Sequence, residues 1–222
     1  MKPRKTIALL LGALLATVGF RSCVMTSCLI PSTGMEPSLY PGDRILVNRW
    51  SYGLRLPLMQ WWGYHRPADR PVHRGDLLVF NNPGNLSEPV ADRREVFISR
   101  CLGTPGDTLL VDSLFSVHLS GAAVPDRKFL YAYPRQKERW LDSLQDLRPL
   151  IVPSRGKTIR VHPWNRTLLC NTLVLHEHKQ AEIRHDTLYV EGCPVQHCFF
   201  SQDYYWVGSN NSVNLSDSRR FR

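Results

Sequence analysis

The hydroxyl and amine side chains of this sequence are the groups that could carry out nucleophilic chemistry, because a hydroxyl is a weak nucleophile and needs a base beside it. Ser32 and Thr33 follow an apolar N-terminal stretch directly, in the segment Ile-Pro-Ser-Thr-Gly-Met. Lysine is scarce, since only six of the 28 basic residues are lysine. Arginine stays protonated in proteins and cannot serve as the base. If an amine serves as the base, it must therefore come from one of these few lysines.

A second group with chemical potential is His176-Glu177-His178, with His185 and His197 downstream. Two imidazoles two residues apart would lie on one face of a strand. A metal site would need a third and a fourth ligand to converge on them. We therefore expect solvated strand histidines, no metal site and no cofactor.

Two of the six cysteines, Cys193 and Cys198, are close enough in sequence to form a disulfide in an oxidising compartment. The alternative is that all six are reduced and buried. Cys101 lies inside an apolar run and is expected to be a core thiol.

The first thirty residues predict the compartment. Three basic residues precede an uncharged run, 6–20, which alone is too short for the roughly 30 Å hydrocarbon core. Arg21 can snorkel and residues 22–30 add no charge, so a span of about 20 residues is available. We expect an uncleaved signal-anchor, single-pass in the bacterial cytoplasmic membrane, with the N-terminus inside and the bulk of the chain extracytoplasmic. The alternatives are a cleaved signal peptide, for which an A-x-A-like site is lacking, and a buried core helix.

An aromatic cluster follows this segment, Trp61-Trp62-Gly63-Tyr64 with Trp50 nearby. Such rings are common at the lipid interface, and they also fill ordinary cores. Both interpretations stay open.

The composition excludes several classes of protein. The chain has 222 residues, of which 43% are hydrophobic and 21% charged, so it can bury a core. Its net charge of +9 is spread evenly along the chain instead of forming a patch. We therefore expect no nucleic-acid partner.

Beyond the first thirty residues the pattern predicts a mainly β chain of short strands separated by Gly- and Pro-rich turns. One segment, 134–147, has helical spacing of its apolar residues and prolines at both ends. The expected strands are 44–47, 76–80, 96–101, 108–111, 158–161, 167–175, 187–190 and 204–207.

Four boxes, in chain order, resemble those of type I signal peptidases (family S26), the membrane-anchored serine peptidases that remove signal peptides. We call them the first box (30–39), the second (41–47), the third (74–80 continued by 98–107) and the fourth (208–219). The resemblance implies a signal-peptidase/LexA-like antiparallel β-sheet fold. It also implies three regions: an N-terminal transmembrane helix (1–29), a core β domain (30–111 with 201–222), and a variable second domain with one helix (112–200).

The resemblance further implies a Ser–Lys dyad, and here the chain departs from the family. The nucleophile position, directly before Met35, is Gly34, and the general-base position, directly before Arg100, is Ser99. Glycine offers no nucleophile, and a serine hydroxyl cannot replace an amine as base. Both catalytic groups are therefore missing.

The resemblance assigns other roles around these positions. Ser32 is the candidate side-chain donor of the oxyanion hole. The expected groove for the signal peptide comprises Ile30, Pro31, Met35, Leu39, Phe97 and Ile98, and the expected structural residues are Arg100, Asp217, Ser218 and Arg219.

We therefore expect a membrane-anchored, signal-peptidase-like protein of the secretion pathway that binds signal peptides and is catalytically degenerate. Its expected partners are signal peptides of preproteins, the lipid bilayer and an active signal peptidase paralogue. The alternative is an active signal peptidase with a non-standard nucleophile. An unrelated membrane-anchored β module would require the four boxes to be accidental.

Overall fold

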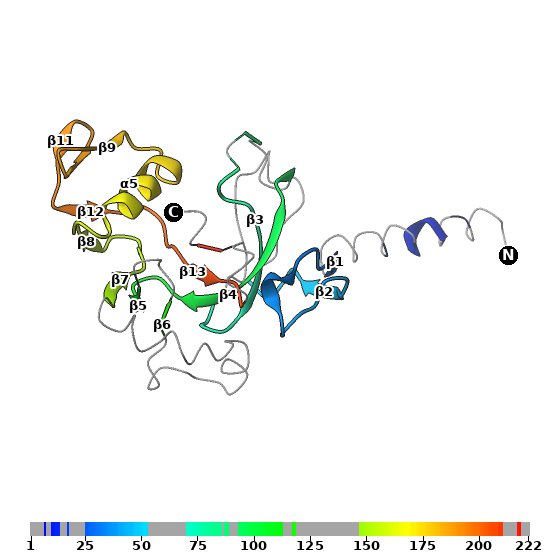
Figure 1. Ribbon diagram of the computed structural model, residues 1–222. Coiled ribbons are helices and arrows are strands. Elements are labelled where there is room, and N and C mark those ends of the chain that lie inside the picture. Colours follow the sequence, from blue (N-terminus) through cyan, green and yellow to red (C-terminus); the bar gives the residue numbers. More distant parts are fainter. Residues whose placement is uncertain are drawn as a thin grey trace. The chain divides into compact units, whose positions relative to one another are not determined.

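The computed structural model describes residues 7, 10–13, 17, 25–52, 70–85, 87–88, 93–112, 117–118, 147–210 and 217–218 (Figure 1). In these ranges the chain is mainly β, with antiparallel sheets and few helices, as the sequence predicts. Residues 1–32 and 39–72 form one compact unit, and residues 33–38 and 73–222 form a second. The expected division into a core domain and a variable second domain stays a prediction.

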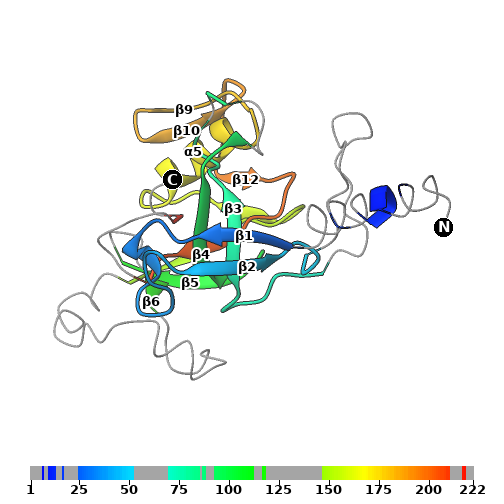
Figure 2. The same ribbon diagram turned by 90° about the vertical axis from the view of Figure 1, so that its right-hand side faces the viewer.

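The first unit contains an antiparallel ribbon of β1 (Met25–Leu29) and β2 (Arg44–Asn48), which Figure 2 shows side by side. A tight turn enters β2, because the Asp43 N–H donates to the Tyr40 carbonyl at 3.1 Å. Gly42 in this turn has φ +90°, a conformation that glycine adopts without strain. The predicted turn and the predicted strand at 44–47 are both confirmed.

Strand β1 occupies a stretch that the sequence analysis placed at the end of the anchor, residues 1–29. The stretch is uncharged, so its composition alone does not separate it from a membrane segment. The burial of its side chains alternates, and every residue of β1 pairs with one of β2, which is the behaviour of a strand. Residues 7, 10–13 and 17 are helical. Within the part of the chain that the structure describes, no helix combines the length and the apolar character needed to cross a bilayer.

The second unit is built around a three-stranded antiparallel sheet in the order β13-β4-β3 (Figure 1). A second sheet has the order β6-β5-β7, and a third, β11-β10-β9, packs against the helix α5. Strands β8 and β12 form a two-stranded sheet. The strands are β3 (Leu77–Asn81), β4 (Val96–Gly103), β5 (Thr108–Val111), β6 (Val117–His118), β7 (Arg148–Ile151), β8 (Thr158–Arg160), β9 (Ala181–Arg184), β10 (Thr187–Val190), β11 (Cys193–Pro194), β12 (His197–Phe199) and β13 (Trp206–Gly208).

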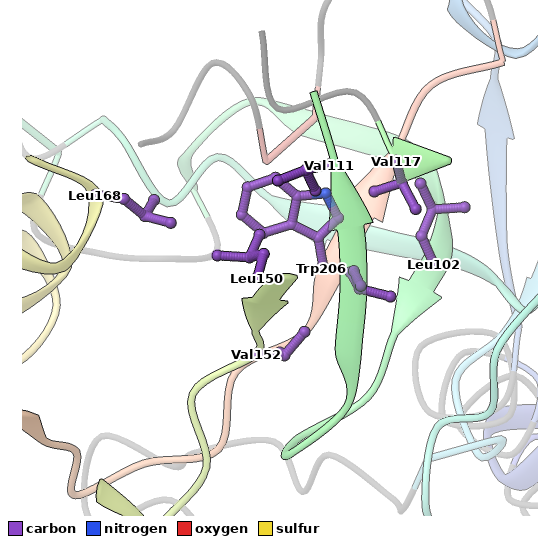
Figure 3. Packing of buried hydrophobic residues seen from close by; sticks show 8 residues of the cluster. Leu102, Val111, Val117, Leu150, Val152, Leu168 and Trp206 are labelled. Carbon is purple, nitrogen blue, oxygen red and sulfur yellow. The ribbon is translucent and has the colours of Figure 1, made fainter. Parts of the chain in front are cut away.

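A buried cluster joins the first two of these sheets. Figure 3 shows the indole of Trp206 between Leu150 and Val111, and Trp206 is only 6% exposed. Because β13 carries Trp206 and leads directly into the fourth box, this cluster fixes where that box begins. The cluster consists of Leu102, Leu109, Val111, Val117, Leu150, Val152, Leu168 and Trp206.

The stretch 167–175, predicted as a strand, is instead the helix α5 (Arg166–Leu175). Its buried residues include Leu169 and Leu173, which are four apart and share one face of a helix. A short apolar run is compatible with both structures, but α5 has ten residues, which is longer than a typical strand. The length of the run was therefore the signal that favoured a helix.

The histidine pair also differs from the prediction, because His176 is the C-cap of α5 and not part of a strand. His178 follows with φ 54°, so the two imidazoles do not share a strand face. Glu177 between them has a side chain only 1% exposed, which accepts hydrogen bonds from the Ser201 N–H (3.0 Å) and the Tyr204 hydroxyl (3.0 Å). These bonds hold the end of α5 against the segment that leads into β13.

The other predicted strands agree with the structure to within one or two residues, 158–161 with β8 and 204–207 with β13 among them. The predicted helix 134–147 and the aromatic cluster 61–64 lie outside the described residues, except for Leu147. Trp50, the described member of the aromatic group, is 53% exposed.

Candidate functional site

Part of the first box belongs to the second unit, as the short 3-10 helix η1 (Thr33–Met35) and the turn that follows. Gly34 and Met35 are both buried. The Ser38 N–H donates to the Met35 carbonyl at 2.8 Å and closes the turn. Cα atoms of η1 lie within 8 Å of Cα atoms of β4. The segment that carries Gly34 therefore lies beside the strand that carries Ser99.

Ser99 occupies the middle of β4, opposite Leu78 of β3, and it is completely buried. Side chains alternate along a strand, so Phe97 shares the face of Ser99 and Ile98 shares the face of Arg100. The expected groove positions Phe97 and Ile98 therefore face opposite sides of the sheet. Only Phe97 lies on the same side as the expected general-base position.

Arg100 connects the first box to the third. Its Nη2 donates to Ser38 Oγ at 3.1 Å, and its Nη1 donates to the Gly75 carbonyl at 2.8 Å. Arg100 is 8% exposed, and burial lowers the pKa of its guanidinium from the usual value. A guanidinium nevertheless stays protonated in proteins, so Arg100 is a fixed donor and not a base.

Asn210 connects the fourth box to the first. Its Nδ2 donates to the Met35 carbonyl at 2.9 Å and to Ser38 Oγ at 2.9 Å, so both N–H groups of the amide are used. Ser38 Oγ thus accepts from Arg100 and Asn210 at once. Neither Ser38 nor Asn210 has a role that could be predicted from the sequence, although both lie inside the boxes. Their pairing depends on contacts between distant segments, which spacing does not reveal.

The fourth box also fixes the end of β13 through two further residues. Asp217 is fully buried, and its Oδ2 accepts from the Ser209 N–H at 2.9 Å. Ser218 Oγ accepts from the Val207 N–H at 2.9 Å, and the Ser218 N–H donates to the Val207 carbonyl at 3.1 Å. Ser218 therefore satisfies both backbone groups of Val207, one through its own backbone N–H and the other through its hydroxyl oxygen.

Glycine at the start of the fourth box allows a close approach of two strands. Gly208 lies opposite Arg100 in the pairing of β13 with β4. A Cβ at Gly208 would overlap a terminal methyl of the buried Leu102 side chain, so a larger residue here would require Leu102 to shift. The close approach aligns the fourth box with Arg100.

The remaining expected residues of the first box belong to the first unit, whereas Gly34 and Ser99 belong to the second. Ile30 is 3% exposed, Pro31 is exposed, and Ser32 and Leu39 are half-buried. The assignment of Ser32 to an oxyanion hole stays a prediction. Arg219 lies outside the described residues.

One lysine approaches the third box, which the sequence analysis did not foresee. A Cβ built at Gly106 would lie 2.8 Å from Lys157 Nζ and 3.7 Å from Ser154 Oγ. Gly106 follows the end of β4 at Gly103, which lies about 13 Å along the strand from Ser99. Lys157 is therefore not a substitute for a base at Ser99. The hydroxyl of Ser154 is buried, which keeps a peptide from reaching it.

The two parts of the third box are joined by an ion pair. Arg74 Nε donates to Asp107 Oδ2 at 2.8 Å, and Thr104 donates to the same oxygen through its N–H and its hydroxyl, both at 2.6 Å. Burial alone would raise the pKa of Asp107. The hydrogen bonds from Arg74 and Thr104 outweigh it and lower this pKa to about 2.

Replacing this carboxylate gives a prediction about acid stability. A carboxyl whose pKa falls on folding stabilises the protein above its unfolded pKa, and this contribution disappears as the pH falls through the folded pKa. We expect Asp107→Asn to lower the free energy of unfolding by about 1–2 kcal/mol at pH 7, since the group is partly exposed. The difference from wild type should vanish between about pH 4 and about pH 2.

Urea unfolding followed by circular dichroism across this pH range measures the effect. Asp186→Asn is the matched control, because Asp186 also pairs with an arginine but its side chain is 89% exposed. That control should change stability by less than about 0.5 kcal/mol. A loss at Asp107 that persists unchanged at pH 2 would contradict the assignment.

The expected disulfide between Cys193 and Cys198 is not formed, because both are free thiols. Cys193 is exposed in β11, whereas Cys198 points into the core from β12 and is 2% exposed. The two strands belong to different sheets, so closeness in sequence does not bring the sulfur atoms together. Cys101 is a core thiol as predicted, and burial raises its pKa to about 12.

Comparison with known proteins agrees with the four boxes. A family model described as "Signal peptidase, peptidase S26" matches residues 4–222. The chain is 36% identical over 107 residues to "Signal peptidase I" of Pseudomonas aeruginosa, a match that covers 48% of this chain and 34% of that protein. It is 28% identical over 152 residues to "Probable signal peptidase I-2" of Synechocystis, covering 68% and 61%. It is 24% identical over 204 residues to "Signal peptidase I" of Helicobacter pylori, covering 86% and 67%. The chain thus spans about a third of the Pseudomonas relative and under two thirds of the Synechocystis one.

Proposed function

The chain belongs to the signal peptidase family, peptidase S26, and from this premise we propose that it binds signal peptides of exported preproteins without cleaving them. One observation carries the proposal. The positions that the resemblance assigns to the family's nucleophile and base are Gly34 and Ser99, while the first, third and fourth boxes are hydrogen-bonded to one another. Cleavage needs a hydroxyl and a neutral amine within about 3 Å of each other, and these two residues supply no amine and only one, buried hydroxyl.

Support for retained binding comes from how the first box is held. Ser38 accepts from Arg100 and Asn210, so the loop that contains Gly34 is attached to both the third and the fourth box. Binding of an extended peptide draws much of its affinity from main-chain hydrogen bonds, which need an ordered strand and loop but no catalytic group. Loss of the dyad therefore removes the capacity to cleave a peptide and leaves the ordered strand and loop on which peptide binding depends.

A direct test uses the purified full chain in detergent and a fluorescein-labelled signal peptide that ends in A-x-A. We expect saturable binding by fluorescence anisotropy and no cleavage product above the buffer control by mass spectrometry. A matched peptide in which lysine replaces both alanines should bind at least about 10-fold more weakly, because a charged side chain loses its solvation in an apolar groove. Cleavage by the unmodified protein that Ser32→Ala abolishes would overturn the proposal and identify a relocated nucleophile.

We also propose that the chain is anchored in the bacterial cytoplasmic membrane by its N-terminal segment, with residues from Pro31 onward outside. The basic residues before the uncharged run 6–20 motivate this orientation. Protease added to intact spheroplasts should digest the folded part and leave a short N-terminal stub. A chain that stays protected until the spheroplasts are lysed would contradict this topology.

An active signal peptidase paralogue in the same membrane is the partner that this role suggests, because a protein that binds without cleaving leaves the hydrolysis to another chain. Cross-linking in native membranes followed by mass spectrometry would test this. Recovery of this chain with preproteins but never with an active peptidase would restrict the proposal to substrate binding.

A further inference from the structure

One hydroxyl group of the candidate site still has a proton to donate. A serine hydroxyl carries one donor and two acceptor positions. Ser38 Oγ accepts from Arg100 Nη2 at 3.1 Å and from Asn210 Nδ2 at 2.9 Å, so both of its acceptor positions are filled. Among the described residues no group accepts the proton of this hydroxyl, the nearby carboxylate of Glu36 included. The proton is therefore available to a ligand.

The direction of this donor is fixed by its two partners. A guanidinium can only donate, and the Met35 carbonyl, which accepts from the same amide, orients Asn210 with its nitrogen toward Ser38. The groups around a hydroxyl oxygen are arranged roughly as a tetrahedron, so Cβ and the two donors leave one direction for the proton. Ser38 is exposed, as is Pro37 before it, so a ligand can reach the group.

The surroundings of Ser38 favour a charged acceptor over a neutral one. Arg100 stays protonated, and a hydroxyl that accepts hydrogen bonds is polarised by them and donates more strongly itself. An oxygen that accepts from Ser38 would lie roughly 5 Å from Arg100 Nη2, close enough for attraction between the charges. Hydrogen bonds to ionised groups are also about twice as strong as those between neutral groups. A carboxylate therefore gains more here than a main-chain carbonyl.

We propose that the Ser38 hydroxyl binds the terminal carboxylate of a cleaved signal peptide. The inference rests on the proposed function and names the form of signal peptide that the chain retains. Cleavage of a preprotein gives the signal peptide a new C-terminal carboxylate, whereas the same residue of the uncut preprotein has a neutral carbonyl. Capture of a C-terminal carboxylate is a recurring mode of peptide recognition. An endoproteolytic step must therefore supply the ligand, and under the proposed function another chain performs that step.

The experiment uses the purified full chain in detergent and two fluorescein-labelled peptides with the same signal sequence, ending in A-x-A. One peptide ends in a free carboxylate and the other in a carboxamide, so at neutral pH their charge differs only at the C-terminus. We expect fluorescence anisotropy to show at least about 10-fold tighter binding of the carboxylate peptide. In Ser38→Ala this preference should fall below about 3-fold, whereas Ser38→Thr, which keeps the hydroxyl, should retain it.

The preference is a ratio measured on one protein sample. A general loosening of the loop weakens the binding of both peptides alike and leaves the ratio unchanged, and circular dichroism confirms that each variant is folded. Ser87→Ala is the matched control, because Ser87 is also exposed but its hydroxyl already donates to Asn85 Oδ1 at 2.6 Å. This control should keep the full preference.

Two results would overturn the inference and leave the proposed function standing: equal binding of the two peptides by the wild type, or an unchanged preference in Ser38→Ala. Absence of saturable binding of either peptide would overturn both the inference and the proposed function. The two kinds of failure are therefore distinguishable.

Discussion

Changing Gly34→Ser together with Ser99→Lys is expected to create signal-peptide cleavage, which under the proposed function the unmodified chain lacks. The double change restores the two groups that the family's dyad requires. Position 99 is completely buried, and burial lowers the pKa of a lysine toward the range in which it is neutral and serves as a base. The φ angle at Gly34 is not positive, unlike those at Gly42 and Gly75, so serine fits the backbone there without strain.

Matched variants separate the two groups. Gly34→Ala with Ser99→Lys keeps the amine but offers no hydroxyl, and Gly34→Ser with Ser99→Met keeps the hydroxyl beside a chain of similar length without an amine. We expect the Ser–Lys variant to cleave a labelled preprotein at least about 100-fold faster than either control, since the two groups act as a unit. Its rate should rise with pH, because only the neutral amine accepts the proton of serine.

A lysine is larger than the serine it replaces, so folding of each variant is checked by circular dichroism and urea unfolding. If the folded Ser–Lys variant cleaves no faster than its two controls, the positions do not form a shared site and the proposed correspondence is wrong. Equal cleavage by the wild type would show instead that its nucleophile lies elsewhere.

Much of the β framework could be predicted because its strands are short, apolar and bounded by turn residues. The strands at 44–48, 77–81 and 96–103 follow or precede Gly-containing turns, and the turn at Gly42 has the backbone conformation that such a residue allows. Local sequence carries this information. The helix α5 was missed because its polar residues, Thr167, Asn171 and Thr172, are too few to mark a clear helical period, which left the length of the run as the signal.

Strand β1 and the cysteines were misjudged for a different reason. An uncharged segment beside an apolar run continues it in composition, and only the pairing of β1 with β2 identifies it as a strand. Cys193 and Cys198 are neighbours in sequence but lie in different sheets. In both cases the contact that decides the structure involves a distant part of the chain. The local spacing of residues gives no information about such a contact.

At the candidate site, too, the residue types could be predicted from the sequence, whereas the contacts between distant segments could not. The substitution of glycine and serine at the expected dyad positions can be recognised from the sequence, because it depends only on which residues occupy positions 34 and 99. The hydrogen bonds that hold the boxes together cannot be recognised from the sequence, because they join Ser38, Arg100 and Asn210, which lie in three separate boxes. The resemblance assigned Arg100 a structural role, and the structure adds the partners through which it acts.

Replacing Asn210 should therefore loosen the candidate site and destabilise the second unit. Asn210→Leu removes both N–H donors while keeping a side chain of similar size, which leaves Ser38 Oγ and the Met35 carbonyl with one donor fewer each. Because Asn210 is 5% exposed and Met35 is buried, water replaces the bond to the Met35 carbonyl poorly. We expect the free energy of unfolding to fall by about 2–3 kcal/mol, measured by urea unfolding.

The matched control is Asn171→Leu, a half-buried asparagine on α5 whose side chain makes no hydrogen bond within the described residues. It should cost less than about 1 kcal/mol. Under the proposed function, Asn210→Leu should also weaken signal-peptide binding by about 10-fold at a temperature where the variant is fully folded, and Asn171→Leu should not. Equal losses of stability in the two variants would show that Asn210 contributes only generic packing. A loss of stability without a loss of binding would show that the loop around Gly34 is not part of the binding surface, because a site that depends on that loop must respond when Asn210 no longer holds it.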